Sequence, residues 1–372
     1  MRLASLPGVL IGICLLPGAR PLEAQRLSDR GQLGTGGEAR VLTFGSHPAL
    51  RQIRQLTLPV GVAASFRRFT VQLGSTWVST RLTNAAGASQ SAAHVTDTDV
   101  RGSYVFGRDA VVATVLVNLP TGPRRASVEE YNVIGAISPT FLGFPVAGYA
   151  SGFSVTGGLA GAMQAGRWSL GLAGSLRLNS EFTPYMDSVG PIAYKPGLEG
   201  RLRAGADGLV GASRLSLGLT YSTFGDDQVG ATGGAARGQY RPGPRWLIEA
   251  GLVAPAGPGI LSLSAWSFHR AAGDTTGVSV GNRENLTAAE MAFSVPVAPR
   301  LSLVPMVAGR VSKPQAGEGK MVGVGLGLRF EVSESVSLTP LARYDTGSIT
   351  DASGVRSNLH GWYSSVFVRL SY

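Results

Sequence analysis

The feature that most constrains this chain is a period-two alternation of apolar residues with small or polar ones, which recurs along most of its length. Successive side chains of a β-strand point to opposite faces, so this alternation predicts strands with one apolar face. The clearest segment spans residues 167–179, and the same pattern returns in 214–221 and 322–330. In the first segment the apolar face consists of Trp168, Leu170, Leu172, Gly174, Leu176 and Leu178.

The composition is that of a membrane protein without membrane helices. The chain is 44% hydrophobic and only 15% charged, yet no apolar run approaches the roughly 18 residues that a spanning helix needs. Lipid offers no hydrogen bonds to the backbone, so a closed β-barrel is the other structure that can cross a bilayer. In such a barrel the apolar face of each strand meets lipid and the other face lines the lumen.

The connections between the predicted strands separate a barrel from a soluble β-sandwich. Short turns such as 67–68 and 165–166 alternate with longer loops such as 82–96 and 120–149. This alternation is expected when one rim faces the periplasm and the other faces outward, and a sandwich has no reason to follow it. Fifteen candidate strands lie near 56–66, 69–81, 97–106, 110–119, 150–163, 167–180, 197–209, 213–224, 240–253, 259–270, 286–296, 300–311, 321–332, 336–347 and 361–372.

The expected fold is therefore all-β, a transmembrane antiparallel up-and-down β-barrel of fourteen to sixteen strands with short periplasmic turns and long outer loops. Single-chain bacterial barrels contain an even number of strands. Sixteen strands are preferred, with Ala39–Gly45 supplying the additional one. Fourteen remain if one candidate segment is not a full crossing.

The N-terminal 24 residues are typical of a signal peptide, with a positive Arg2, an apolar core and a cleavage site near Ala24. The only cysteine, Cys14, lies inside this segment. A mature chain without cysteine has neither a disulfide framework nor a thiolate metal site. Residues 25–55 follow as a lumen hatch or a first strand, and residues 56–372 as the barrel.

The C-terminal strand resembles the membrane-insertion signal of bacterial outer-membrane proteins, in which alternate apolar residues end on a terminal aromatic. We therefore expect the protein in the outer membrane of a Gram-negative-type bacterium. Its expected partners are outer-membrane lipid, lipopolysaccharide and the barrel-assembly machinery. The residues of the signal are Val368, Leu370 and Tyr372.

The predicted lumen is rich in arginine. The net charge is +10, and a charged side chain on the lipid face is destabilising, so strand parity places the arginines inside. Rings of arginine favour anions, although pairing with acids would instead fill a closed lumen. The lumen-lining candidates are Arg167, Arg177, Arg201, Arg203, Arg214, Glu249, Trp266, Phe268, Glu290, Arg310, Arg329, Arg343 and Arg369.

The loop 121–149 is unusually apolar for an outward loop. It is interpreted either as a cover folded over the barrel mouth, as a capture surface for an apolar molecule, or as a constriction folded into the channel. The capture candidates are Ile134, Ile137, Phe141, Leu142 and Phe144.

A resemblance to a known family rests on residues 110–122, which end in Leu119-Pro120-Thr121-Gly122, and on 152–182. These segments, on either side of a long third-hairpin loop, resemble the outer-membrane channels for hydrophobic compounds. That group includes the long-chain fatty-acid transporters and the barrels of phenol and toluene degradation. The resemblance implies a fourteen-stranded barrel with an N-terminal hatch and a loop groove for apolar substrates. The arginine-rich lumen departs from it.

Other functions are disfavoured by the sequence. The four histidines show neither a nucleophile arrangement nor metal-pair spacing, so no enzyme, metal site or cofactor is expected. The arginines are spaced along strands rather than gathered in one patch, which argues against nucleic acid. The expected function is a channel that passes small hydrophobic or amphipathic molecules into the periplasm. The alternatives are an anion-leaning diffusion porin and a closed structural barrel with a filled lumen.

Overall fold

The computed structural model describes residues 30–107, 110–186, 190–231, 238–275, 278–280, 283–313, 318–350 and 354–371. The expected signal peptide and Tyr372 lie outside these residues. Among the described residues no helix is both long and apolar enough to cross a membrane.

The chain forms a closed antiparallel β-barrel, because the last strand pairs with the first from Gln32↔Ser371 to Gly45↔Asn358. Sixteen strands make the wall, which confirms the expected fold and the preferred even number. Two of the segments, β4 and β5, together form one crossing, since both pair with β3. Around the barrel lie β1 (Arg30–Gly45), β2 (Leu50–Phe66), β3 (Phe69–Asn84), β4 (Ser89–Val95) with β5 (Thr98–Phe106), β6 (Val111–Leu119), β7 (Ser154–Ala165), β8 (Trp168–Asn179), β11 (Glu199–Val210), β12 (Ser213–Phe224), β15 (Arg245–Ala256), β16 (Gly259–Arg270), β19 (Glu284–Ala298), β20 (Leu301–Ser312), β21 (Glu318–Glu331), β22 (Val336–Thr350) and β23 (Arg356–Ser371).

Two sequence-based expectations are corrected here. The sixteenth strand is β1, which is longer than Ala39–Gly45, and it lies in the wall with β2. Of the two alternatives for residues 25–55, the described part forms the first strand and not a hatch. The strand number departs from the fourteen that the family resemblance implied. The segment 82–96 is not a loop. It forms the top of β3 and strand β4, joined by a tight turn, because its apolar residues Leu82 and Ala92 face the interior.

The strands alternate between an outer apolar face and an inner face, as the sequence predicts. On β2 the exposed apolar residues include Leu56, Leu58, Val60 and Val62. Between them Gln55 and Thr57 are buried toward the lumen. An exposed apolar belt around a closed sheet is what a lipid-facing barrel wall requires.

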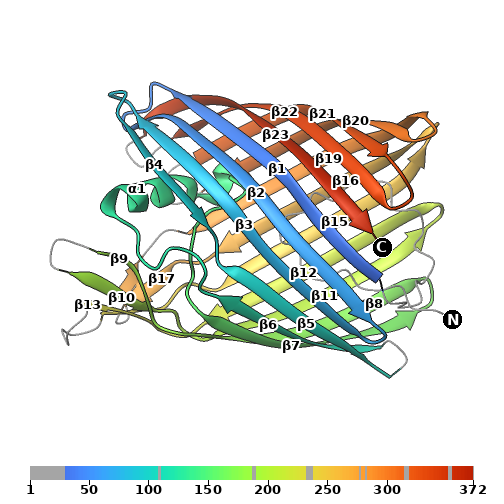
Figure 1. Cartoon of the computed structure of the whole chain (residues 1–372), viewed down its shortest axis with the longest axis horizontal. Helices are drawn as coiled ribbons and strands as arrows, with labels where there is room; N and C mark the ends of the chain where they lie inside the picture. Colours follow the sequence, from blue (N-terminus) through green and yellow to red (C-terminus); the bar gives the residue numbers. More distant parts are fainter. Residues whose placement is uncertain are drawn as a thin grey trace.

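The two ends of the barrel differ (Figure 1). The start of β1, the end of β23 and the short turns lie at one end, which is the periplasmic end in barrels of this type. Four of these turns contain a glycine with positive φ, a conformation that a side chain disfavours: Gly107, Gly166, Gly211 and Gly257.

The opposite, extracellular end carries the long connections. A four-stranded sheet projects there, made of β9 (Phe182–Met186), β10 (Pro191–Lys195), β13 (Asp227–Ala231) and β14 (Gly238–Tyr240). A two-stranded sheet consists of β17 (Gly273–Thr275) and β18 (Val278–Val280). The connection between β6 and β7 holds helix α1 (Val128–Ile137) and the 3-10 turn η1 (Thr140–Leu142).

Candidate functional site

The site is built around the connection 120–153, named here the inner loop, which turns into the extracellular half of the barrel. Helix α1 begins at a capping box, in which the Ser127 hydroxyl accepts from the Glu130 backbone N–H and the Glu130 carboxylate accepts from the Ser127 N–H. Such a box satisfies two donors that the first turn leaves free. Gly143 ends η1 in the left-handed conformation with φ 63°. Figure 1 shows α1 inside the extracellular end.

The apolar residues of the inner loop form the main core of the molecule with the barrel wall. Val133, Ile137 and Phe141 are almost fully buried. They belong to one cluster with wall residues from β1, β2, β3, β4, β19, β21 and β23: Leu42, Phe44, Ile53, Val78, Leu82, Ala92, Leu286, Met321 and Leu359. Burial of this much apolar surface holds the loop inside the lumen.

Polar contacts fix the loop in addition to the apolar core. The Gln55 side chain forms two hydrogen bonds with the backbone of Val146: its Nε2 donates to the carbonyl at 2.8 Å, and its Oε1 accepts from the N–H at 3.0 Å. Asp97, between β4 and β5, accepts from the Gly122 N–H at 3.0 Å and the Ser151 N–H at 2.7 Å. One carboxylate therefore joins both ends of the inner loop.

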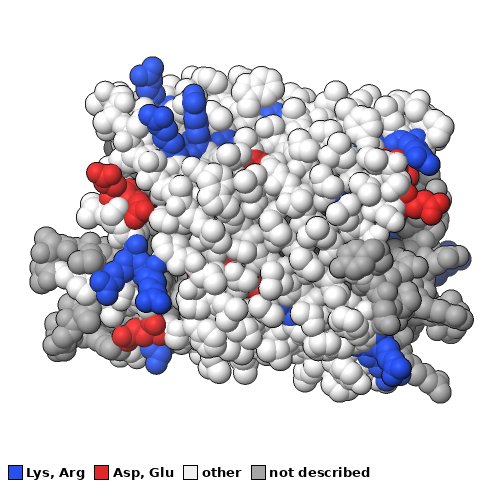
Figure 2. Space-filling model, viewed as in Figure 1, with Lys and Arg blue, Asp and Glu red and all other residues white. Residues whose placement is uncertain are grey.

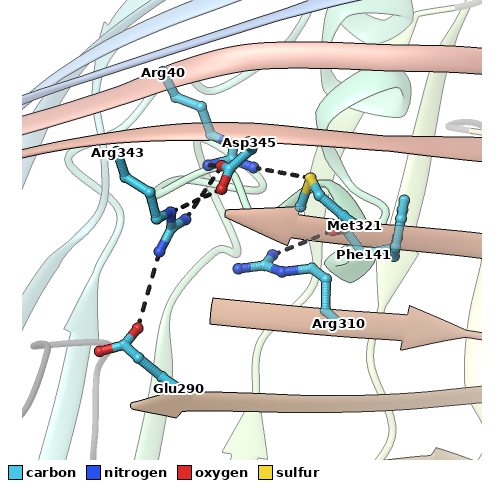
Figure 3. A network of polar contacts seen from close by, with 7 residues as sticks. All are labelled: Arg40, Phe141, Glu290, Arg310, Met321, Arg343 and Asp345. Atoms are coloured by element: carbon cyan, nitrogen blue, oxygen red, sulfur yellow. Dashed lines mark hydrogen bonds and ion pairs between the residues drawn. The ribbon is translucent and has the colours of Figure 1, made fainter. Parts of the chain in front are cut away.

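A cluster of charged side chains lies beside this loop in the lumen (Figure 3). Arg40 is fully buried and donates to Asp345 at 3.0 Å. Arg343 binds the same carboxylate, with Nε to Oδ1 at 2.9 Å, and its Nη1 lies 3.9 Å from Glu290. Buried charges are stable only when they are paired in this way. Arg40, Arg310, Arg343, Asp345 and Glu290 are called the charge cluster below.

Arg310 connects the charge cluster to the inner loop. It donates to the Phe141 carbonyl at 3.2 Å. A Cβ on Gly143 would lie 2.0 Å from Arg310 Nη1, so the close approach of the guanidinium requires glycine there. The Arg40 guanidinium also lies 5.9 Å from the Phe144 ring centroid, within reach of a cation–π contact.

An apolar pocket of about 430 Å³ lies at the extracellular end, between α1 and the ends of β2, β3 and β4. Its lining consists of Ala49, Leu50, Leu82, Asn84, Ala88, Gln90, Tyr131, Asn132, Gly135 and Ala136.

The strand register places all but one of the lumen-lining candidates on the inner face. Arg201, Arg203 and Arg214 pair with neighbouring acids, with distances of 2.7 Å to Glu199, 2.7 Å to Glu249 and 2.9 Å to Asp207. Trp266 and Phe268 pack against the core of the inner loop. The remaining inner-face candidates are Arg177, Glu290, Arg310, Arg329, Arg343 and Arg369.

The exception is Arg167. It is exposed in the turn between β7 and β8, because Ala165 pairs with Trp168 and leaves Gly166 and Arg167 as the turn residues. The capture surface is also corrected. Ile137, Phe141, Leu142 and Phe144 are buried and Ile134 is half-buried, since the loop turns its apolar residues into the lumen instead of outward. Val368 and Leu370 lie on the outer face of β23, next to β1 and β22.

Several site residues were missed by the sequence reasoning. Arg40 and Asp345 share the inner face with Arg343, and parity along β1 and β22 is the signal that finds them. Gln55 lies just before the strand predicted from residue 56. Asp97 had no signal, because its role depends on backbone groups that meet only in the folded loop.

One titratable group of the inner loop, Glu130, contacts the barrel wall. His94 on β4 lies 2.7 Å from Glu130. Burial raises the pKa of Glu130, but hydrogen bonds from Ser127 and His94 lower it by more, so the carboxylate pKa is below its usual value. In the described part of the chain, no group of three or more His, Cys, Asp or Glu side chains is placed to hold a metal ion.

Comparisons with known proteins give similarity of fold only. No family model and no curated protein matches the sequence. Similar solved structures include a loop-deletion form of OmpT of Vibrio cholerae, with 10% identity over 93% of this chain and 98% of that one and a TM-score of 0.44. A mutant of the monoaromatic hydrocarbon channel TodX has 10% identity over 92% and 90% and a TM-score of 0.47. A FadL homologue of Pseudomonas aeruginosa has 11% identity over 92% and 90% and a TM-score of 0.42.

The expected resemblance to fatty-acid and hydrocarbon channels is thus confirmed as a resemblance. At these identities and TM-scores it carries no argument about what this chain transports. The closed sheet, the exposed apolar belt and the alternating connections are those of an outer-membrane channel barrel. The substrate has to be argued from the inner loop and the lumen.

Proposed function

We propose that the protein is a gated outer-membrane channel that passes small hydrophobic or amphipathic molecules into the periplasm, with the inner loop as its gate. The observation that carries this proposal is the position of the loop. Its helix and η1 fill the extracellular half of the lumen with apolar side chains. A simple diffusion pore for ions would not place an apolar core across its own path.

The apolar pocket beside α1 is suited to receive such a molecule from outside. Small-molecule sites are mostly apolar with a few polar groups, and this pocket combines Leu50, Leu82 and Tyr131 with Asn84 and Asn132. A molecule bound there touches the helix directly. It is therefore placed to bias the position of the inner loop.

The periplasmic half of the lumen suits the polar end of an amphipathic solute. Arg214 and Arg369 are lumen-facing and exposed. Arginines in a pore favour anions, so carboxylates and similar amphiphiles are the expected substrates among polar-headed molecules. The same arginines support the second candidate, an anion-leaning porin.

The test is a deletion within the inner loop that keeps the contacts of Asp97 with the two ends of that loop. Because this carboxylate binds both Gly122 and Ser151, a short Gly-Ser linker can replace residues 126–149 without straining the wall. We expect the refolded full-length protein to show rare, small openings in planar bilayers, and the deletion variant to show large, steady ones. Uptake of octanoate and toluene into liposomes should differ between the full-length protein and the deletion variant.

The outcomes separate the candidates. Large, steady, anion-selective steps from the intact protein, measured by reversal potential under a salt gradient, favour the porin. No conductance and no uptake from either protein favours a closed structural barrel. Uptake of octanoate or toluene by the intact protein without steady ion conductance supports the proposal.

A further inference from the structure

The extracellular end of β2 and β3 carries three exposed arginines, Arg51, Arg54 and Arg81, named here the basic patch. Arg54 and Arg81 are direct cross-strand partners, so their side chains share one face of the sheet. This is the outer face, because Leu56 and Leu58 follow Arg54 at alternate positions and are exposed. Figure 2 shows basic side chains grouped at the extracellular end of this surface.

The patch lies where the lipid-facing belt ends. Directly below Arg54 on β2 comes the apolar row Leu56, Leu58, Val60 and Val62. On β3, Trp77 faces outward four residues below Arg81, and tryptophans typically mark the interface of the bilayer. Four residues of a strand tilted by about 40° rise roughly 10 Å along the membrane normal. The guanidinium groups are therefore at the level of the lipid headgroups of the outer leaflet.

The arginines of the patch have no acidic partner. In the described part of the chain, no carboxylate lies within ion-pair distance of any of the three. Arg54 Nε donates to the Gln52 side chain at 2.7 Å, and Gln52 Nε2 in turn donates to Thr43 at 3.1 Å. Gln52 thus orients the guanidinium and leaves its charge uncompensated.

Two like charges directly opposite each other on a sheet destabilise it. An anion with several oxygens removes this repulsion, and arginine binds phosphate through two parallel N–H donors. Surface attraction of arginine to anionic lipid is favourable and acts over about a Debye length. A polyvalent anion at the membrane surface would remove this repulsion.

We propose that the basic patch is a binding site for the phosphate groups of an anionic lipid of the outer leaflet, bridged between Arg54 and Arg81 with Arg51 beside them. The acyl chains of that lipid lie along the apolar row of β2. The site is separate from the lumen. It attaches strands β2 to β4, the part of the wall that contacts the inner loop, to that anionic lipid.

The test uses native mass spectrometry of the folded full chain in detergent, with diphosphoryl lipid A as the probe. The variant is Arg54→Glu, which turns the repelling pair into a cross-strand ion pair with Arg81 and so preserves folding. The matched control is Arg68→Glu, the same charge change at an exposed residue of the periplasmic turn. A second variant, Arg81→Gln, removes one of the two opposed charges and serves if Arg54→Glu does not fold.

We expect wild type and Arg68→Glu to bind diphosphoryl lipid A equally, and Arg54→Glu and Arg81→Gln to bind it at least tenfold more weakly. Phosphatidylethanolamine, which has no net negative charge, should not compete. Equal binding by wild type, Arg54→Glu and Arg81→Gln overturns the proposal. Complete displacement of the lipid by millimolar inorganic phosphate also overturns it, because the site then takes a free anion and not a lipid headgroup.

Discussion

Replacement of Gln55 by alanine is expected to release the inner loop from the barrel wall. Gln55 holds the loop from β2 through two hydrogen bonds to Val146, at 2.8 and 3.0 Å, and its Nε2 also reaches Thr80 at 3.1 Å. All of these groups belong to buried or half-buried residues. Alanine removes the contacts but leaves the strand pairing of β2 intact.

The size of the effect follows from these bonds. Each hydrogen bond contributes about 1 kcal/mol, and a buried backbone group left without a partner costs about 1–3 kcal/mol. The loop is therefore destabilised by roughly 3 kcal/mol, and since 1.4 kcal/mol is a factor of ten, the ratio of released to closed loop rises about 100-fold.

Planar bilayer recordings measure this ratio as the frequency and duration of open events. The matched control is Gln72→Ala on β3, a lumen-facing and exposed glutamine. Heat-dependent gel mobility shows that each variant is folded. The gate assignment is refuted if folded Gln55→Ala opens no more often than wild type and Gln72→Ala.

Three further predictions concern the charge cluster and the inner loop. Asp345→Asn leaves the fully buried Arg40 without its carboxylate, so urea unfolding should show a loss of about 3–5 kcal/mol; Asp207→Asn, at an exposed ion pair, should lose less than about 1 kcal/mol. Glu130 has a lowered pKa in the folded loop, so its contribution is present at neutral pH and is lost as the pH falls below its usual value of 4.5. Wild type should then open more often below that pH. Glu130→Gln should open more often than wild type at neutral pH, and its opening frequency should change little as the pH falls. A variant with the same pH dependence as wild type contradicts this role. Gly143→Ala places a side chain at positive φ and against the Arg310 guanidinium, so we expect about 1–3 kcal/mol of destabilisation and more frequent openings. A variant with the stability and the opening frequency of wild type would contradict this prediction.

The sequence predicted the barrel because its evidence is local and repeated. The alternation around Trp168 and Leu170, and the turn glycines such as Gly166, each report only on neighbouring residues. Repetition over the chain then fixes the fold class. Errors arose where a shift of one residue changes the position of a side chain. Parity predicted Arg167 in the lumen, but in the structure it is a turn residue of the hairpin between β7 and β8.

The interior of the lumen was less predictable. Parity correctly placed Arg310 and Arg343 inside, but it does not say which acid each one meets. Arg343 meets Asp345 two residues away on its own strand, while Arg40 reaches the same carboxylate from across 305 positions of sequence. Such partners depend on the closure of β1 against β23.

The sequence by itself therefore determined the class of fold, the direction of the strands and the two faces of the wall, because period-two burial against lipid is a property of each strand alone. Only the tertiary structure decided that β1 completes the wall, that the inner loop fills the lumen, and that Arg54 and Arg81 stand opposite each other outside. These features depend on strand register and on contacts between distant segments. Burial of the apolar inner loop and pairing of its neighbouring residues stabilise these features only in the closed barrel.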